Sequence, residues 1–327
     1  MRILFFKQKQ VQRGLIFLLL MIFTAGIVAN WDLFARRIFG VKPGVRLEGR
    51  VVQGFLPDEV TSLVRTIASQ VNREPRNASY IPETGEIMPA EAGKVVDVAG
   101  TVHGVYATPP GSEAKLLVNT VPPAITEALF QPVYQGNKNS GRVALAINVA
   151  WGEEHLGEML KVLAEEKVKA TFFFVGTWVK LFPEQVQAIA AAGHEVANHG
   201  LFHGHPAQMS REDVKKLIAD NALLLWSVTG KQPANLFAPP YGEISPEVLA
   251  AAGELGNYTI LWSVDTVDWK NPEPTGMLQR VLSKVEPGGI ILMHPTVASK
   301  TALRQLIRSL RQRNLEPCTV SMVMQKA

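Results

Sequence analysis

The sequence predicts an α/β fold, with a parallel sheet closed or nearly closed as a barrel, preceded by a small α+β domain and an N-terminal membrane helix. Three observations predict it. From residue 141 onward, apolar runs typical of buried strands alternate with helical patterns. Ahead of this region, residues 41–126 hold one amphipathic helix and several strand-like runs. The chain begins with basic residues followed by a long apolar run.

Residues 1–13 form a basic tail that contains Arg2, Lys7, Lys9 and Arg13. Residues 14–34 are predicted to be a transmembrane anchor or an export signal. The strictly apolar part, 14–29, is shorter than the roughly 20 residues of a standard spanning helix, but Trp31, Leu33 and Phe34 can extend it into the interface. We expect a cell-membrane protein with a single N-terminal anchor and its domains on the extracytoplasmic side. A cleaved signal peptide is the alternative, although Ile27-Val28-Ala29 lacks a small residue at its first position.

The small domain is predicted to contain one helix that starts at Pro57. Its apolar residues recur at helical spacing, namely Val60, Leu63, Val64, Ile67, Ala68 and Val71. Strand-like runs follow at 78–81, 95–98 and 115–118. The next residues, 127–140, are polar and rich in turn formers, which predicts a linker.

The second domain covers residues 141–327. Its predicted strands lie at 143–149, 170–175, 290–295 and near Cys318, and its first helices lie at 154–166 and 183–192. In a barrel of this kind, site residues gather at the carboxyl ends of the strands. Five candidates fall near such ends: Asn148, His199, Ala238, Asp265 and His294.

His199 and His203 are the strongest chemical signal, because two imidazoles four residues apart can reach one metal ion. A lone pair at this spacing is more often surface or core decoration, so three further segments matter. Pro239-Pro240 forms a rigid turn that presents Tyr241. An apolar run leads into Asp265, Asp268 and Trp269, and another ends at His294. A carboxylate there could orient a neighbouring imidazole.

The order and spacing of these pieces resemble the polysaccharide deacetylase (NodB-homology) family of carbohydrate esterases, from about Gly141 to the end of the chain. The resemblance implies a distorted (β/α) barrel with a divalent metal, usually zinc, that removes acetyl groups from chitin, peptidoglycan or xylan. It also implies roles for the matching residues: metal ligands His199 and His203, general acid His294 tuned by Asp265 or Asp268, and substrate contacts Pro240, Tyr241 and Trp269.

The first family motif is altered in this chain. The family opens with Thr-Phe-Asp-Asp-Gly, whose aspartates are the catalytic base and the third metal ligand, whereas residues 146–152 read Ala-Ile-Asn-Val-Ala-Trp-Gly. Asn148 then stands at the degenerate base position, and a neutral amide cannot take a proton from water near neutral pH. If the glycines are aligned instead, Ala150 and Trp151 occupy the two positions.

Ala238 replaces an arginine that holds the base in the family. The loss of the base aspartate and the loss of this arginine are consistent with each other. A buried arginine without its carboxylate would be an uncompensated charge costing several kcal/mol. Since general base assistance contributes about 10²–10⁴ in rate, we expect weak or no turnover and a zinc site that is weak or absent. Glu153, Glu154 or His205 could supply a substitute ligand or base. The favoured alternative places both glutamates at a helix start and His205 in an exposed loop.

The resemblance extends to biology and to the small domain. The Asn-Val-Ala-Trp-Gly-Glu-Glu opening resembles a membrane-anchored subgroup associated with sporulation. Residues 75–98 resemble a peptidoglycan-binding module, with a simple spacer as the alternative. The three tryptophans Trp151, Trp262 and Trp269 are candidates for a sugar-stacking platform, with core packing favoured for the first two.

Two functions follow. The first is a hydrolase acting on carbon–nitrogen (non-peptide) bonds of N-acetylated cell-wall glycan such as peptidoglycan. The second is a catalytically impaired glycan-binding or scaffolding protein of the envelope. A net charge of +4 without a basic cluster interleaved with aromatics excludes a nucleic-acid partner. The single Cys318 excludes an internal disulfide.

Overall fold

A computed structural model describes residues 8–325, so Arg2 and Lys7 of the basic tail lie outside the described residues. The chain forms two compact units. Unit one runs to Arg76 and resumes over 91–123, and unit two comprises 77–90 and the chain from Ala124 onward.

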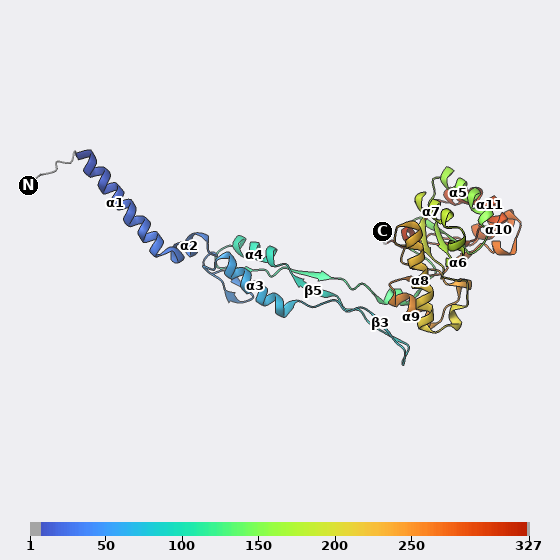
Figure 1. The fold of residues 1–327 in the computed structure, drawn as a ribbon, viewed down its shortest axis with the longest axis horizontal. Coiled ribbons are helices and arrows are strands. Elements are labelled where there is room, and N and C mark those ends of the chain that lie inside the picture. The colour runs from blue at the N-terminus through green and yellow to red at the C-terminus, as the bar shows by residue number, and fades with distance from the viewer. Residues whose placement is uncertain (1–7, 326–327) are drawn as a thin grey trace, which may run out of the picture. The chain divides into compact units, whose positions relative to one another are not determined.

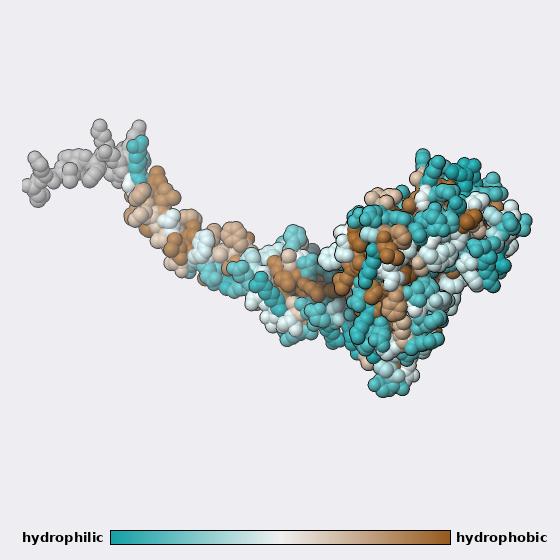
Figure 2. Space-filling view, turned by 45° about the vertical axis from the view of Figure 1, so that its right-hand side comes forward, coloured by the Kyte–Doolittle hydropathy of each residue, from teal (hydrophilic) through white to brown (hydrophobic). Residues whose placement is uncertain are grey.

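Unit one begins with an apolar helix, α1 (Gln8–Ala29), whose residues 12–29 are long and apolar enough to cross a membrane. A signal sequence near an N-terminus has the same properties. Figure 2 shows the hydrophobic surface of this segment. The apolar segment predicted to reach residue 34 is interrupted at Asn30, after which a separate helix, α2 (Trp31–Phe39), begins.

The rest of unit one packs two helices against short strands. The predicted helix is confirmed as α3 (Pro57–Val71), which packs against α4 (Val98–Ala107). Strands β1 (Arg46–Leu47), β2 (Arg50–Val51) and β6 (Glu113–Ala114) form one sheet. β5 (Gly93–Val96) pairs antiparallel with β7 (Val118–Val121). Helix α4 was not predicted, and the strand expected at 115–118 lies at 118–121 instead.

Residues 77–90 and 124–140 are part of unit two, which differs from the predicted boundary at residue 127. The hairpin of β3 (Ser79–Ile81) and β4 (Glu86–Met88) is one part, and the short helix η1 (Glu127–Phe130) is another. Leu129 and Phe130 are buried with Ala78. The expected linker therefore carries core residues, and β8 (Pro132–Val133) adds a strand to the main sheet.

The main sheet of unit two is parallel, in the order β14-β15-β9-β10-β11-β12-β13-β8. The further bounds are β9 (Arg142–Val149), β10 (Thr171–Phe174), β11 (Glu195–Asn198), β12 (Leu236–Phe237), β13 (Tyr258–Ile260), β14 (Val264–Asp265), β15 (Ile290–Met293) and β16 (Glu316–Cys318). β16 also pairs with β9. This distorted half-barrel of parallel strands confirms the predicted fold class.

Helices surround the sheet (Figure 1). They are α5 (Glu153–Glu165), α6 (Gly176–Leu181), α7 (Pro183–Ala191), α8 (Arg211–Thr229), α9 (Pro246–Glu254), α10 (Pro274–Leu282), α11 (Val297–Gln312) and α12 (Val320–Met324). Alternate residues of a strand face opposite sides. Along β9, Leu145, Ile147 and Val149 pack in the cluster with the helices, whereas Ala144 and Ala146 belong to the opposite cluster. Asn148 continues the second series and so faces the interior.

Candidate functional site

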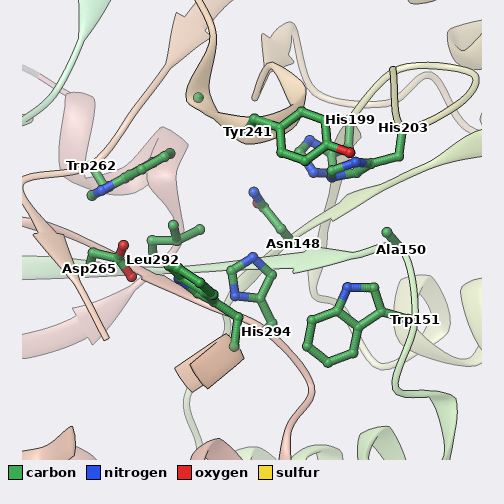
Figure 3. Close-up of a pocket in the computed structure, with 12 residues that line it drawn as sticks. Asn148, Ala150, Trp151, His199, His203, Tyr241, Trp262, Asp265, Leu292 and His294 are labelled. Carbon is green, nitrogen blue, oxygen red and sulfur yellow. The ribbon is translucent and has the colours of Figure 1, made fainter. Parts of the chain in front are cut away.

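A cavity of about 390 Å³ opens where the parallel strands end. It is lined by Asn148, Ala150, Trp151, His199, His203, Tyr241, Gly242, Trp262, Asp265, Trp269, Leu292 and His294 (Figure 3). Cavities of this size at the carboxyl ends of strands are the usual ligand sites of such folds. Most of these residues were candidates from the sequence, and the order of the strands in the sheet places them around one cavity.

His199 and His203 lie on one side of the cavity, with ring centroids 5.2 Å apart. His199 follows β11 and is fully buried, and its Nδ1 lies 2.6 Å from the carbonyl oxygen of Ala238. A carbonyl only accepts, so Nδ1 carries the hydrogen and Nε2 keeps its lone pair. Burial lowers the pKa of His199 to about 3 and also lowers the pKa of His203. Both rings are therefore neutral, the form that binds a metal.

The residues around these rings do not complete a zinc site. Zinc sites in enzymes use three protein ligands. Across residues 8–325, no group of three His, Cys, Asp or Glu side chains is placed to hold a metal ion. Val149 is fully buried in the cluster with the helices, and Ala150 offers the cavity only a methyl group. In the two alignments of the first motif, the anionic ligand falls at Val149 or at Trp151, and neither side chain can supply it.

Asn148 ends in the cavity with an unsatisfied amide. Its side chain is 5% exposed and points between the histidine pair and His294 (Figure 3). Its Oδ1 is buried and has no hydrogen-bond partner in the described part of the chain. Ala238, also 5% exposed, lines a small internal void together with Asn148. Buried polar atoms are rarely left unpaired, so the unpaired Oδ1 marks Asn148 as a residue of functional interest.

His294 is held by Asp268. The carboxylate accepts the ring Nδ1–H at 2.8 Å and the backbone N–H of His294 at 2.6 Å, and it also accepts the hydroxyl of Ser299. Asp268 is fully buried, so this arrangement fixes the ring and leaves Nε2 toward the cavity. Asp265, offered by the sequence as the other candidate, does not contact His294. It lines the cavity, and its Oδ1 accepts the backbone N–H of Val267 at 2.7 Å.

Four aromatic side chains border the cavity, namely Trp151, Trp262, Trp269 and Tyr241. Trp151 stacks on His294, with centroids 5.7 Å apart and planes 9° from parallel. Trp151 and Trp262, for which packing was favoured, therefore belong to the site with Trp269. Pro240 is buried and is absent from the lining, so its part is to shape the turn that presents Tyr241.

The side chains considered as substitutes lie outside the cavity lining. Glu153 and Glu154 form the first turn of α5, as the favoured alternative expected. His205 is half exposed, with its Nδ1 2.8 Å from a carboxylate oxygen of Glu243, and its ring stacks on Tyr241. Leu292 lines the cavity without having been identified as a candidate from the sequence, whereas Gly242 belongs to the proline-tyrosine-glycine motif. No polar or metal-ligand pattern marks a residue such as Leu292.

Comparisons with known proteins agree with this geometry. The sequence model of the polysaccharide deacetylase family matches residues 135–260. The uncharacterized protein YlxY of Bacillus subtilis is 32% identical over 79% of this chain and 81% of its own length. A peptidoglycan-N-acetylglucosamine deacetylase of Bacillus cereus is 34% identical, and the match covers 50% of this chain and 59% of that enzyme. A chitooligosaccharide deacetylase of Sinorhizobium fredii is 36% identical over 42% of this chain and 64% of its own length.

Similar solved structures include a protein described as a pseudoenzyme and an esterase. BA3943 of Bacillus anthracis, described as a CE4 family pseudoenzyme, superposes with a TM-score of 0.59 at 31% identity, covering 81% of this chain and 94% of that one. A BA3943 mutant described as having restored enzymatic activity also has a TM-score of 0.59, at 30% identity, covering 81% and 97%. PdaA of B. subtilis, a family 4 carbohydrate esterase, gives 0.57 at 25% identity, covering 60% and 85%.

Proposed function

Because the chain belongs to the polysaccharide deacetylase family, we propose that it is a catalytically silent member that binds N-acetylated cell-wall glycan in the deacetylase groove without hydrolysing it. The observation that carries this proposal is the buried, unpartnered amide of Asn148. Asn148 stands where the family motif supplies a base in one alignment, and Ala150 stands there when the glycines are aligned, so neither alignment leaves a carboxylate at that position. Ala238 stands where the motif supplies the partner of the base.

The chemistry of the cavity supports loss of turnover. A positioned base contributes about 10²–10⁴ in rate, and an amide cannot replace it. The cavity carboxylate Asp265 already accepts a backbone hydrogen bond and lies away from the histidine pair in Figure 3. Metal-dependent hydrolysis is the activity of the family, but this chain keeps two neutral imidazoles of its ligand set.

The same cavity is suited to binding an acetamido sugar. The side-chain N–H of Asn148 can donate to the carbonyl of an acetamido group. Trp269 is 49% exposed at the cavity, with Lys270 over one face of its ring, so the other face can stack on a sugar. Tyr241 is 57% exposed, and its ring already stacks on His205. The volume of about 390 Å³ lies within the range of small-molecule sites.

The biological ligand we propose is peptidoglycan on the extracytoplasmic side of the cell membrane. Relatives named as peptidoglycan and chitooligosaccharide deacetylases act on N-acetylated glycans, which supports the ligand class. The apolar helix α1 supports a membrane location. A role in sporulation rests on the resemblance of the altered opening motif. Whether unit one also binds peptidoglycan or serves as a spacer is tested by the same binding measurements on unit-one variants.

Calorimetric titration of the full-length protein with an N-acetylglucosamine tetramer and a glucosamine tetramer tests the proposal. We expect binding of the acetylated tetramer only. Trp269→Ala and Asn148→Ala should each weaken binding about tenfold, which corresponds to roughly 1.4 kcal/mol for one lost stacking or hydrogen-bonding contact. Trp226→Ala is the matched control, because Trp226 is 47% exposed on α8, outside the cavity lining. Equal effects of Trp269→Ala and Trp226→Ala, or no binding at all, would contradict the proposal.

A residual hydrolase is the second candidate, because the His294–Asp268 pair is intact. It predicts release of acetate that disappears in Asp268→Asn, since the substituted amide no longer fixes the His294 ring. A catalytically silent protein releases no acetate, so none is expected from the wild type or from Asp268→Asn, with or without added zinc. Acetate measured enzymatically after long incubation separates the two.

A further inference from the structure

Helix α2 carries an apolar stripe on its surface. Trp31, Phe34 and Ile38 are spaced i, i+3 and i+7, so they share one face of the helix. These side chains are 56%, 39% and 58% exposed, and the rings of Trp31 and Phe34 lie 5.9 Å apart. Large apolar groups aligned in this way require a nonpolar or interfacial partner.

The other side of α2 is tied to unit one. Ala35 is buried, and the guanidinium of Arg36 donates to both carboxylate oxygens of Glu59 on α3, at 2.7 and 2.9 Å. The Arg36 hydrogen bonds lower the pKa of Glu59, so the carboxylate stays ionised. The same carboxylate also accepts the backbone N–H of Leu56 at 2.8 Å. A bidentate pair with this extra bond prevents α2 from rolling about its axis.

The end of α2 is fixed as well. A side chain at Gly40 would place its Cβ 2.2 Å from the carbonyl oxygen of Arg36 and 2.8 Å from that of Gly54. The backbone of Val41 donates to Phe55 at 3.0 Å and accepts from Gly54 at 2.9 Å. The direction of the stripe relative to unit one is therefore set by the fold.

The occupant of the stripe follows from the connection to α1. Only Asn30 separates the last residue of α1 from Trp31, and a single residue spans about 3.8 Å between Cα atoms. When α1 crosses a bilayer, the stripe begins at the membrane boundary. Tryptophan is enriched at that depth. Arg37 is exposed on the neighbouring part of the helix, where it can reach anionic headgroups.

We propose that α2 is an in-plane interfacial helix, with Trp31, Phe34 and Ile38 inserted at the headgroup boundary of a phospholipid bilayer. The Arg36–Glu59 pair then transmits this orientation to unit one, so that unit one lies against the membrane in a single pose. The proposal depends on α1 being retained as a span and is independent of glycan binding.

Site-directed spin labelling of the full-length protein in anionic liposomes tests it. The single Cys318 is buried and is replaced by serine, and nitroxides are attached at Phe34→Cys and Ile38→Cys. Leu20→Cys in α1 is the deep reference, and Gln70→Cys, exposed near the end of α3, is the aqueous control. Labels at 34 and 38 should be open to oxygen and protected from a water-soluble nickel complex, at a shallower depth than label 20.

Three outcomes overturn the proposal. The first is nickel access at positions 34 and 38 equal to that at Gln70→Cys. The second is an aqueous label at position 20, which means that α1 does not span. The third is protection at 34 and 38 that disappears when the protein is diluted in lipid, which indicates a second copy of the chain as the occupant.

A second measurement needs only conservative variants. Brominated lipids quench tryptophan at the interface, so quenching of the wild type should fall in Trp31→Phe. Trp226→Phe, which removes a tryptophan that is 47% exposed in unit two, should quench like the wild type. Unchanged quenching in Trp31→Phe overturns the proposal.

Discussion

Asn148 and Ala238 are small neutral side chains at positions that we propose correspond to a charged pair of the family motif. Both are 5% exposed and line one internal void. An isolated carboxylate or guanidinium in such a place costs several kcal/mol, so neither charge is tolerated without the other. Because this chain has a neutral side chain at both positions, the void between them contains no uncompensated charge.

The missing carboxylates can be tested at Ala150, which holds the position of the base when the glycines of the motif are aligned. Ala150 lines the cavity, whereas Val149 is fully buried among the helix-packed core residues. Ala150→Asp adds a carboxylate to a cavity that already holds two neutral imidazoles, so we expect tighter zinc binding than in the wild type. Zinc retained after dialysis is the measurement.

Val149→Asp is the control for that substitution. It buries an unpaired carboxylate and should lower the free energy of unfolding by several kcal/mol without adding a ligand. Equal zinc in the wild type and Ala150→Asp, or zinc gained by Val149→Asp instead, contradicts this account of which residue faces the cavity.

His194 gives a pH-dependent stability that is unrelated to the cavity. It is 7% exposed, its Nδ1 accepts the backbone N–H of Ala170 at 3.2 Å, and burial lowers its pKa from 6.5 to about 4. Below pH 6.5, His194 therefore binds a proton in the unfolded chain but stays neutral in the folded chain until the pH approaches 4. Its contribution to stability is present above pH 6.5 and is lost as the pH falls toward 4, by roughly 2–3 kcal/mol at most.

Urea unfolding at several pH values checks this prediction. His194→Asn keeps an acceptor for Ala170 and should flatten the profile between pH 4 and 6.5. His103→Asn, at an exposed histidine of unit one, controls for the loss of a histidine elsewhere. A His194→Asn profile as steep as that of the wild type contradicts the assignment.

The sequence could predict the polar residues of the site because their types are rare and their spacing is distinctive. His199, His203, Tyr241, Asp265 and His294 all line the cavity. The choice between Asp265 and Asp268 could not be made, because both follow the same strand and only the loop geometry decides which one reaches His294. The inward direction of Trp151 is set by its stack on His294, a contact distant in sequence.

Among the elements, η1 differs most from the prediction, because residues 127–140 were expected to form a linker. Phe130 is 2% exposed, and its ring packs so closely on Gly253 of α9 that a Cβ added there would lie 2.9 Å from the nearest ring carbon. Phe130→Ala should therefore lower the free energy of unfolding of unit two by about 3–5 kcal/mol, as for a core aromatic. A flexible linker would show a change within about 0.5 kcal/mol.

Chemical denaturation followed by near-ultraviolet circular dichroism measures this difference. Phe202→Ala is a suitable control, because Phe202 is 45% exposed. Comparable losses in the two variants would show that η1 is not part of the core.

Long periodic or continuously apolar elements were predictable. Strands β9, β10 and β15 and helices α3, α5 and α7 lie within a few residues of their predicted positions. Helix α4 was not predicted, because its sequence is apolar around the whole circumference and contains two glycines. That sequence is Val-Ala-Gly-Thr-Val-His-Gly-Val-Tyr-Ala. Its start is fixed by Asp97, whose side chain accepts the backbone N–H of Gly100 at 2.8 Å. The strands β3 and β4 are so short that the sequence alone does not indicate to which unit their hairpin belongs.

At the scale of the whole molecule, the chain combines an apolar N-terminal helix, a small unit and a half-barrel whose cavity keeps aromatic and imidazole groups but no positioned base. Retention of the cavity without its carboxylates favours binding over hydrolysis. Under the proposed function, the parts of the chain together hold N-acetylated glycan near the membrane surface.

Mass spectrometry of the bound glycan tests this claim most directly. The full-length protein is incubated with zinc and a saturating N-acetylglucosamine tetramer, binding is confirmed by calorimetry, and the oligosaccharide is then recovered. We predict measurable binding and full retention of the acetyl groups after prolonged incubation. Recovery of tetramer that has lost acetyl groups, in amounts that grow with time and protein concentration, would contradict the account.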